Sequence, residues 1–247
     1  MMSKRSFLKG LVTAGFGGLA AACTKPRKVE RRTVGDVSFV ELVHKEPDPS
    51  LPIVVAIHGQ AGSAENWIDG FTKFPGRARI ALPQGFYPMN KLSELYSWWK
   101  TEAPNDRPID DPELAKLVTE AEERLWKGIA ALAGAQRVIV CGYTQGAILS
   151  YVLAARHPDN VVAGFALAGG CPPSLRPTAK CAPVVAYHGT ADDVIPLAAA
   201  KASIDAFKVH APDSRLREYA GVKHTANDAM HHDFNDDATK ALEAGRR

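Results

Sequence analysis

The chain has 247 residues, with 30 Lys and Arg against 27 Asp and Glu, and 46% of its residues are hydrophobic. Three of the basic residues and none of the acidic ones lie in residues 1–22, so the remainder carries 27 charges of each sign. This balance argues against nucleic-acid binding, and the length suits one well-buried α/β domain.

Residues 1–22 have the pattern of an export signal. Basic residues near the start precede an apolar run at 10–22 with an Ala-rich end, and this run is too short to span a bilayer stably. It ends at Cys23, and the residues before Cys23 resemble a bacterial lipoprotein processing site. We therefore predict an exported, periplasmic or cell-envelope lipoprotein that meets the membrane surface through a lipid on Cys23. An ordinary cleaved signal with an incidental cysteine is the alternative.

The next part of the chain is predicted to pass from a tether into a folded domain. Residues 23–33 are charged and are predicted to be the tether, and residues 34–247 are predicted to be the domain. Loose alternation at 34–44 predicts one or two edge strands. Continuous apolar runs predict buried strands at 53–57 and 78–82.

The second half of the domain alternates between helical and strand patterns. Asp111 and Pro112 have the chemistry of a helix start, and apolar residues then recur at helical spacing until Gly134. Further strands are predicted at 138–141, 161–168, 184–187 and 216–219, and further helices at 147–157, 197–209 and 228–244. Continuous apolar strands separated by helices predict a mostly parallel central sheet with helices on both faces. No insertion is large enough for a cap domain.

The strand at 138–141 runs into Gly142-Tyr143-Thr144-Gln145-Gly146, and this strand–turn–helix pattern is typical of a nucleophile elbow. The two glycines let the backbone arms pass closely, and the hydroxyl of Thr144 would project above the sheet. A Thr hydroxyl can act as a nucleophile. The elbow commonly requires a positive φ, which costs a β-branched residue about 1–3 kcal/mol. The alternative role for Thr144 is that of a helix N-cap.

Polar residues follow other predicted strands at their carboxyl ends, where α/β sheets carry their active groups. The chain order Thr144, Asp192, His224 is the order of hydroxyl, acid and imidazole expected of an α/β-hydrolase. His224 would take the hydroxyl proton and return it to the leaving group, and Asp192 would hold the imidazole tautomer. Residues that compete for the acid and base positions are Asp193, His231 and His232.

Two backbone N–H groups, those of Gln145 and Gln60, are predicted to bind the oxyanion. Gln60 lies in a loop at 58–62 in which glycines allow the amides to turn inward. His58 and His188 are expected to bond to loop backbone rather than to carry protons. No carboxylate–histidine cluster with ligand spacing accompanies them, so no metal is predicted.

Four motifs together resemble the phospholipase/carboxylesterase family of α/β-hydrolases, over roughly residues 50–245. They are His-Gly-Gln-Ala-Gly at 58–62, the elbow, His-Gly-Thr-Ala-Asp-Asp-Val-Ile-Pro at 188–196 and Gly-Val-Lys-His at 221–224. The resemblance implies hydrolysis of small-molecule carboxylic esters or thioesters with no cofactor and no metal. It also favours Asp192 over Asp193 as the acid. Thr144 stands where the family has its serine nucleophile.

Two further pairs of residues have two interpretations each. Trp98 and Trp99 lie in a Pro- and aromatic-rich loop at 86–110, which is the candidate lid, and they could line a substrate pocket or anchor the loop by packing. Cys171 and Cys181 flank a Pro-Pro loop and could form a disulfide in an oxidising compartment. Two free thiols are the alternative.

Three functions are compatible with these motifs: an esterase, a non-catalytic relative that binds a ligand or partner in the same cleft, and an acyltransferase that excludes water from the acyl-enzyme. A binding cleft needs neither an acid, nor a base, nor two oxyanion loops. Their joint presence therefore favours the esterase.

Overall fold

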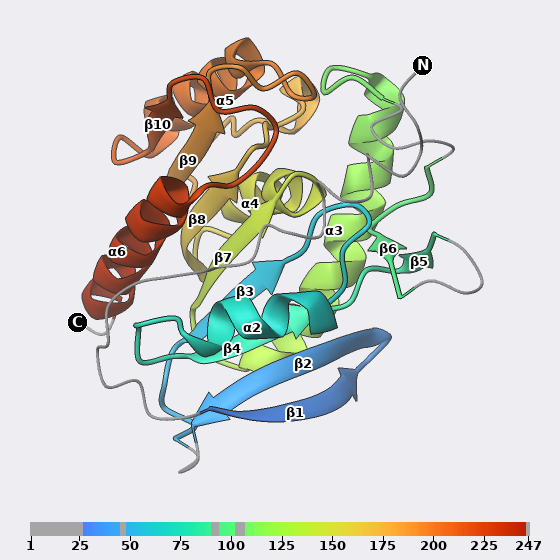
Figure 1. Cartoon of the computed structure of the whole chain (residues 1–247), viewed down its shortest axis with the longest axis vertical. Helices are drawn as coiled ribbons and strands as arrows, with labels where there is room; N and C mark the ends of the chain where they lie inside the picture. The colour runs from blue at the N-terminus through green and yellow to red at the C-terminus, as the bar shows by residue number, and fades with distance from the viewer. Residues whose placement is uncertain (1–26, 45–47, 90–93, 102–106, 246–247) are drawn as a thin grey trace.

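The computed structural model of the chain describes residues 27–44, 48–89, 94–101 and 107–245 (Figure 1). The predicted signal at 1–22 and the predicted lipidation residue Cys23 lie outside these ranges. The described residues contain an eight-stranded sheet in the order β1-β2-β4-β3-β7-β8-β9-β10. Its strands are β1 (Arg27–Val34), β2 (Val37–His44), β3 (Ile53–Ile57), β4 (Arg79–Pro83), β7 (Val138–Tyr143), β8 (Val161–Leu167), β9 (Val184–Gly189) and β10 (Arg215–Tyr219).

The sheet is parallel from β4 to β10 and antiparallel at the β1 and β2 edge. The central strands β3 and β7 are apolar along almost their whole length and are buried on both faces. Such runs are typical of a parallel sheet covered by helices. The predicted α/β-hydrolase fold is confirmed, and no cap domain is apparent in the described part of the chain.

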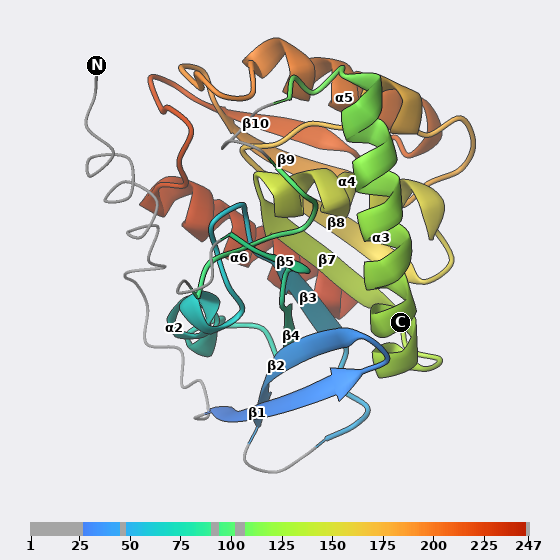
Figure 2. The same cartoon turned by 90° about the vertical axis from the view of Figure 1, so that its right-hand side faces the viewer.

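Helices cover both faces of the sheet (Figure 2). Phe71 of α2 and Phe234 of α6 pack with Val54 and Ile139 on one face. Residues of α3, α4 and α5 pack with the alternate strand residues, such as Val55, on the other. The helices are α2 (Ile68–Thr72), α3 (Pro112–Ala133), α4 (Gln145–Arg156), α5 (Leu197–His210) and α6 (Asp228–Ala244), with single 3-10 turns η1 (Glu65–Trp67) and η2 (Pro173–Leu175) and a small ribbon of β5 (Tyr87–Pro88) and β6 (Tyr96–Ser97).

Helix α3 begins and ends where its sequence predicts. The Asp111 side chain accepts a hydrogen bond from the N–H of Glu113 at 2.8 Å, and Pro112 occupies the first helical position. Gly134 ends the helix with φ 60°, a conformation that glycine adopts without strain. These caps satisfy backbone groups that the first and last turns would otherwise leave unpaired.

The predicted tether at 23–33 is wrong for its second half, because residues from Arg27 onward form β1. Strand β1 pairs antiparallel with β2 through a turn at Gly35, which has φ 61°. The guanidinium of Arg27 donates to the carbonyl oxygens of Phe71 and Gly76, both at 2.8 Å. Charged residues here are strand residues at a sheet edge, where alternate side chains face solvent.

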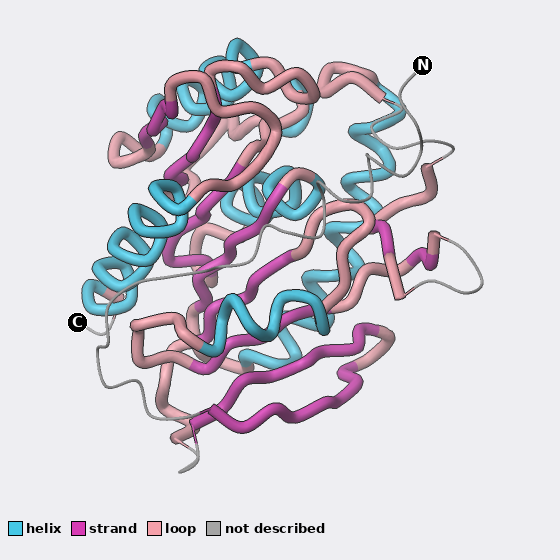
Figure 3. The backbone as a smooth tube through the Cα atoms, viewed as in Figure 1, coloured by secondary structure: helices cyan, strands magenta, loops and turns pink. Residues whose placement is uncertain are grey.

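The loops that follow β3 and β7 lie side by side at the carboxyl end of the sheet (Figure 3). A Cβ atom on Gly146 would overlap the carbonyl oxygen of Ile57, which shows how closely α4 approaches the end of β3. The fold therefore brings the elbow and the loop at 58–62 together.

Candidate active site

Thr144 occupies the turn between β7 and α4 in a left-handed backbone conformation, with φ 47° and ψ −107°. This conformation was predicted for the elbow, and it is strained for a β-branched residue. A Cβ on Gly142 would overlap the backbone of Gly146, so both glycines are required for the turn. The N–H of Thr144 donates to the carbonyl of Leu167 at 3.1 Å and ties the turn to β8.

The side chain of Thr144 is buried, and its two branches have different surroundings. The methyl group faces Gly59, where an added Cβ would collide with it. The hydroxyl makes no hydrogen bond with a described residue and does not cap α4. Thr144 therefore stands at the N-cap position without acting as a side-chain cap.

Asp192 and His224 are joined by hydrogen bonds, although 32 residues separate them in the sequence. Nδ1 of His224 lies 2.9 Å and 3.1 Å from the two carboxylate oxygens. The Asp192 carboxylate also accepts from the backbone N–H groups of Val194 and Ile195, at 2.9 Å and 2.8 Å. Burial alone would raise the pKa of Asp192, but the hydrogen bonds from His224 and from these two N–H groups hold it below its ordinary value.

The competitors for the acid and base positions lie elsewhere. The side chain of Asp193 is 65% exposed and lies 3.8 Å from Lys223. On α6, His231 is buried against a different cavity and the exposed His232 lies near acidic neighbours. Among the acidic side chains of the described residues, Asp192 is therefore the one that is hydrogen-bonded to the ring of His224.

A direct hydrogen bond between the Thr144 hydroxyl and the His224 ring is not formed in the described structure. Tyr143, the neighbour of Thr144, connects the two segments: its hydroxyl donates to the carbonyl of His224 at 3.0 Å, and the two rings lie 5.5 Å apart. Catalytic hydrogen bonds are often formed only when substrate is bound.

The two predicted oxyanion residues, Gln60 and Gln145, line the same cavity as Thr144. Gln145 is the first residue of α4, where backbone N–H groups have no acceptor within the helix. Its side-chain oxygen accepts from the hydroxyl of Ser97 at 3.1 Å and the N–H of Trp98 at 3.0 Å. The Gln60 side chain donates to the hydroxyl of Thr101 at 3.0 Å. The side chains of both glutamines therefore hold the loop at 94–101 in place.

His58 and His188 are bonded to loop backbone, as expected from the sequence. Nε2 of His58 accepts from the N–H of Gly85 at 2.9 Å, so the proton is on Nδ1, which donates to the carbonyl of Gly59 at 2.7 Å. Burial lowers the pKa of His58 to about 4. Burial likewise lowers the pKa of His188, whose Nε2 lies 2.8 Å from the carbonyl of Ile195. Both rings are neutral and stabilise the loops through hydrogen bonds to the backbone.

A cavity of about 720 Å³ opens beside Thr144. Gln60, Gln145 and Trp99 also line it, so Trp99 is placed where a substrate could touch it. Trp98 is fully buried and does not line this cavity, and its indole N–H donates to the carbonyl of His58 at 2.7 Å. The structure thus gives Trp98 the packing role and corrects its assignment to substrate binding.

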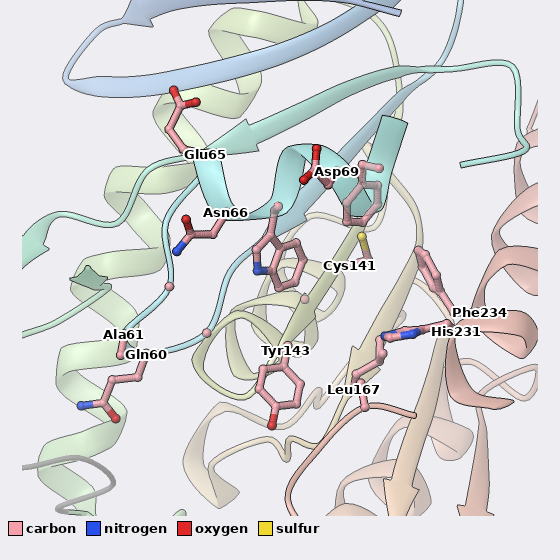
Figure 4. A pocket seen from close by; sticks show the side chains of 16 residues that line it. Gln60, Ala61, Glu65, Asn66, Asp69, Cys141, Tyr143, Leu167, His231 and Phe234 are labelled. Atoms are coloured by element: carbon pink, nitrogen blue, oxygen red, sulfur yellow. The ribbon is translucent and has the colours of Figure 1, made fainter. Parts of the chain in front are cut away.

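A second cavity of about 290 Å³ lies on the α2 and α6 side of the sheet (Figure 4). Gln60 borders both cavities, whereas Tyr143, His231 and Phe234 line only the second one. Thr144 does not line it. The first cavity, with Thr144 on its wall, is therefore the candidate substrate site.

The cysteines and the remaining acids and histidines supply no cross-link or metal site in the described ranges. Cys171 and Cys181 are buried free thiols, so the structure does not contain the disulfide considered from the sequence. Burial raises the pKa of Cys171 to about 12, which keeps it protonated. No group of three or more His, Cys, Asp or Glu among the described residues could hold a metal ion. The described helices include none with the length and apolar character needed to cross a membrane.

Sequence reasoning did not single out Tyr143, Ser97 or Arg176 as site residues. Tyr143 lies within the elbow itself, and its position next to Thr144 was the available signal. Ser97 and Arg176 line or support the site only because distant loops fold onto it. No local pattern marks them.

Comparison with known proteins gives a consistent fold and family. A family model described as Phospholipase/Carboxylesterase matches residues 40–237. NocK of Nocardia uniformis is 29% identical over 200 residues, which are 72% of this chain and 55% of NocK. Feruloyl esterase B of Thermothelomyces thermophilus is 26% identical over 189 residues, which are 69% of this chain and 57% of that enzyme. The chain thus spans little more than half the length of these two curated relatives.

A solved structure with the same fold is TT1662 of Thermus thermophilus, with a TM-score of 0.65 and 20% identity over 88% of this chain and 98% of TT1662. The Bacillus cereus carboxylesterase also has a TM-score of 0.65, with 16% identity over 84% of this chain and 95% of that enzyme. At these identities the structures establish the fold alone.

Proposed function

Because the chain belongs to the phospholipase/carboxylesterase family of α/β-hydrolases, we propose that it hydrolyses carboxylic esters or thioesters with Thr144 as the nucleophile. His224 is the general base in this proposal, and Asp192 orients its ring. The observation that carries it is the hydrogen-bonded pair of Asp192 and His224, held next to a strained elbow whose hydroxyl is not engaged elsewhere.

The reaction follows from the chemistry of these groups. The Thr144 oxygen attacks the acyl carbonyl while Nε2 of His224 takes the hydroxyl proton. The backbone N–H groups of Gln145 and Gln60 stabilise the oxyanion. The intermediate collapses to an acyl-threonine, and the imidazolium protonates the leaving alcohol or thiol. Water then attacks the acyl group with His224 again as base, which releases the acid and restores Thr144.

The close fit between the Thr144 methyl and Gly59 supports a threonine in this role. The methyl occupies space that a side chain at position 59 would otherwise fill. The rotamer that places the methyl against Gly59 also fixes the direction in which the hydroxyl points. A threonine can thus be accommodated at the elbow at the expense of backbone strain.

The test is hydrolysis of 4-nitrophenyl acetate by the wild type, Thr144→Ala and Thr144→Ser, with mass spectrometry of the adduct formed by a fluorophosphonate probe. We expect the adduct on Thr144 and a loss of activity in Thr144→Ala of about 10³-fold or more. If the wild type and Thr144→Ala both equal buffer while Thr144→Ser is active, the chain is a binding relative rather than an enzyme. Transfer of the acyl group to added alcohol in preference to water would make it an acyltransferase.

We also propose export as a lipoprotein, on the sequence of residues 1–23 alone. In a bacterial host, the full chain is expected to incorporate labelled fatty acid and to sediment with membranes. Cys23→Ser is expected to abolish both. A wild-type protein that is cleaved but unlabelled would make Cys23 an incidental residue.

A further inference from the structure

Arg176 lines the cavity beside Thr144 without an acidic partner. It directly follows η2, in the loop between β8 and β9, and it borders the same space as Thr144 and Gln145. Its Nε is buried without a hydrogen-bond acceptor, and it forms no ion pair with a carboxylate in the described ranges. A guanidinium keeps its charge throughout the pH range in which proteins are folded. The Nε atom of Arg176 is therefore shielded from water, and no protein group replaces the lost hydrogen bond.

The other charged groups on the described wall of the cavity do not compensate Arg176. Arg107 donates to the carboxylate of Asp111 at 3.0 Å. Asp110 is an exposed residue and forms no ion pair with Arg176. The cavity beside the candidate nucleophile thus carries one cation that no described residue neutralises.

A second buried polar atom also has no partner in the described part of the chain. It is the hydroxyl oxygen of Tyr151, a fully buried residue of α4. Tyr151 does not line the cavity beside Thr144. Buried polar atoms are normally paired, so the unpaired Nε of Arg176, which borders the cavity, indicates a place for a polar group from outside the chain.

We propose that Arg176 binds a carboxylate of the substrate, so that the enzyme acts on esters that carry a second, ionised carboxyl group. This inference rests on the proposed ester hydrolysis and adds the class of substrate. A guanidinium matches a carboxylate in two parallel hydrogen bonds. Apolar residues such as Ile109, Leu114 and Ile148 also line the cavity and would contact a short hydrocarbon segment between the reacting carbonyl and the carboxylate. The volume of about 720 Å³ lies within the range of small-molecule sites.

The test compares matched esters that differ in the carboxylate. For the acid part, the pair is mono-4-nitrophenyl adipate and 4-nitrophenyl hexanoate; for the alcohol part, the pair is 4-acetoxybenzoate and phenyl acetate. In Arg176→Gln we expect kcat/KM to fall about tenfold or more for the carboxylate ester of at least one pair, and to change less than about twofold for its neutral partner. Arg176→Lys keeps the charge and is expected to restore part of the loss.

The matched control is Lys180→Gln, which removes an exposed cation from the same loop and is expected to leave all four rates unchanged. Equal losses on neutral and charged esters in Arg176→Gln, or no loss on any, would overturn the assignment. If Lys180→Gln lowered kcat/KM for the carboxylate ester as much as Arg176→Gln does, the effect would come from the overall positive charge of the surface and the subsite would be rejected.

A binding measurement separates this inference from the proposed hydrolysis. Calorimetric titration of Thr144→Ala with monomethyl adipate is expected to give binding that Arg176→Gln weakens about tenfold, whether or not the wild type turns over any ester. Binding that depends on Arg176 in a chain without esterase activity would retain the subsite and reject the reaction. Hydrolysis without any dependence on Arg176 would retain the reaction and reject the subsite.

Discussion

Asp192 and His224 are fixed by hydrogen bonds, whereas Thr144 is fixed by close packing of the backbone. The Asp192 carboxylate accepts from a ring and from two backbone N–H groups, and its side chain is fully buried. Thr144 has no side-chain hydrogen bond in the described structure and a strained backbone that depends on Gly142 and Gly146.

The difference separates two ways of preparing a catalytic group. Hydrogen bonds set the tautomer of His224 and the charge of Asp192. A substitution that breaks them should therefore change the rate of hydrolysis and the pH dependence of stability. Steric contacts set the position of Thr144. Substitutions of Thr144 and of a residue that touches it should therefore have non-additive effects on stability. Each of the following experiments tests one half.

Asp192→Asn should have the largest effect, because it removes the charge that stabilises the imidazolium and can reverse the tautomer of His224. We expect kcat for 4-nitrophenyl acetate to fall by about 10³–10⁴-fold with little change in KM. The matched control is Asp193→Asn, since Asp193 is exposed and does not contact His224. A comparable fall in kcat in Asp193→Asn would mean that the pair of Asp192 and His224 does not act as the acid and base of the reaction.

Thr144→Ser should raise kcat by roughly tenfold, because a primary alcohol is less crowded as it attacks and the elbow conformation is less strained for serine. Steady-state rates measure this, and KM should stay within about twofold. An unchanged or lower kcat would show that the contact of the methyl with Gly59 holds the hydroxyl in its reactive direction, which would outweigh the crowding.

Gly59→Ala should lower the free energy of unfolding by about 1–3 kcal/mol, since the added methyl would collide with the methyl of Thr144. In a Thr144→Ser background the penalty should be smaller by about 1 kcal/mol, which chemical denaturation of the four proteins in the cycle would measure. At Gly170 an added Cβ would meet its nearest neighbours at 3.5 Å, so Gly170→Ala is the control. Additive effects of the two substitutions would contradict the steric account of the elbow.

The same two halves differ in how far the sequence predicted them. Chain order pointed to His224 and to an acid at 192 or 193, because the ends of parallel strands must meet at one edge of the sheet, and the family resemblance favoured Asp192. The positive φ of Thr144 also followed from its place between Gly142 and Gly146. The contact of its methyl with Gly59 could not be predicted, since it depends on the distance between the loop at 58–62 and the elbow in the folded protein.

The remaining failures also concern long-range contacts. Strand β1 was mistaken for a tether because the partners of its charged residues are not evident from the local sequence. Arg27, for example, donates to carbonyl groups more than 40 residues away. Trp98 and Trp99 are adjacent, yet one is a buried anchor and the other lines the cavity. A periodic pattern decides which face of an element is apolar, but a loop without periodicity carries no such information.

The smallest effect is the pH dependence of stability, and it tests the hydrogen-bonded half without catalysis. The pKa of Asp192 is lower in the folded protein than its ordinary value, so its ionised form stabilises the fold above about pH 4, and this contribution disappears as the pH falls through the folded-state pKa. His188, whose Nε2 lies 3.4 Å from the carboxylate, has a pKa lowered by burial and adds little charge near neutral pH.

The free energy of unfolding of the wild type should therefore exceed that of Asp192→Asn by its full margin from neutral pH down to about pH 4, and the difference should shrink as the pH falls further. Denaturation curves collected across this range measure it, with Asp193→Asn as the exposed control. A difference that stays constant with pH would mean that the carboxylate of Asp192 owes its place to packing, and the contrast between the two halves of the site would disappear.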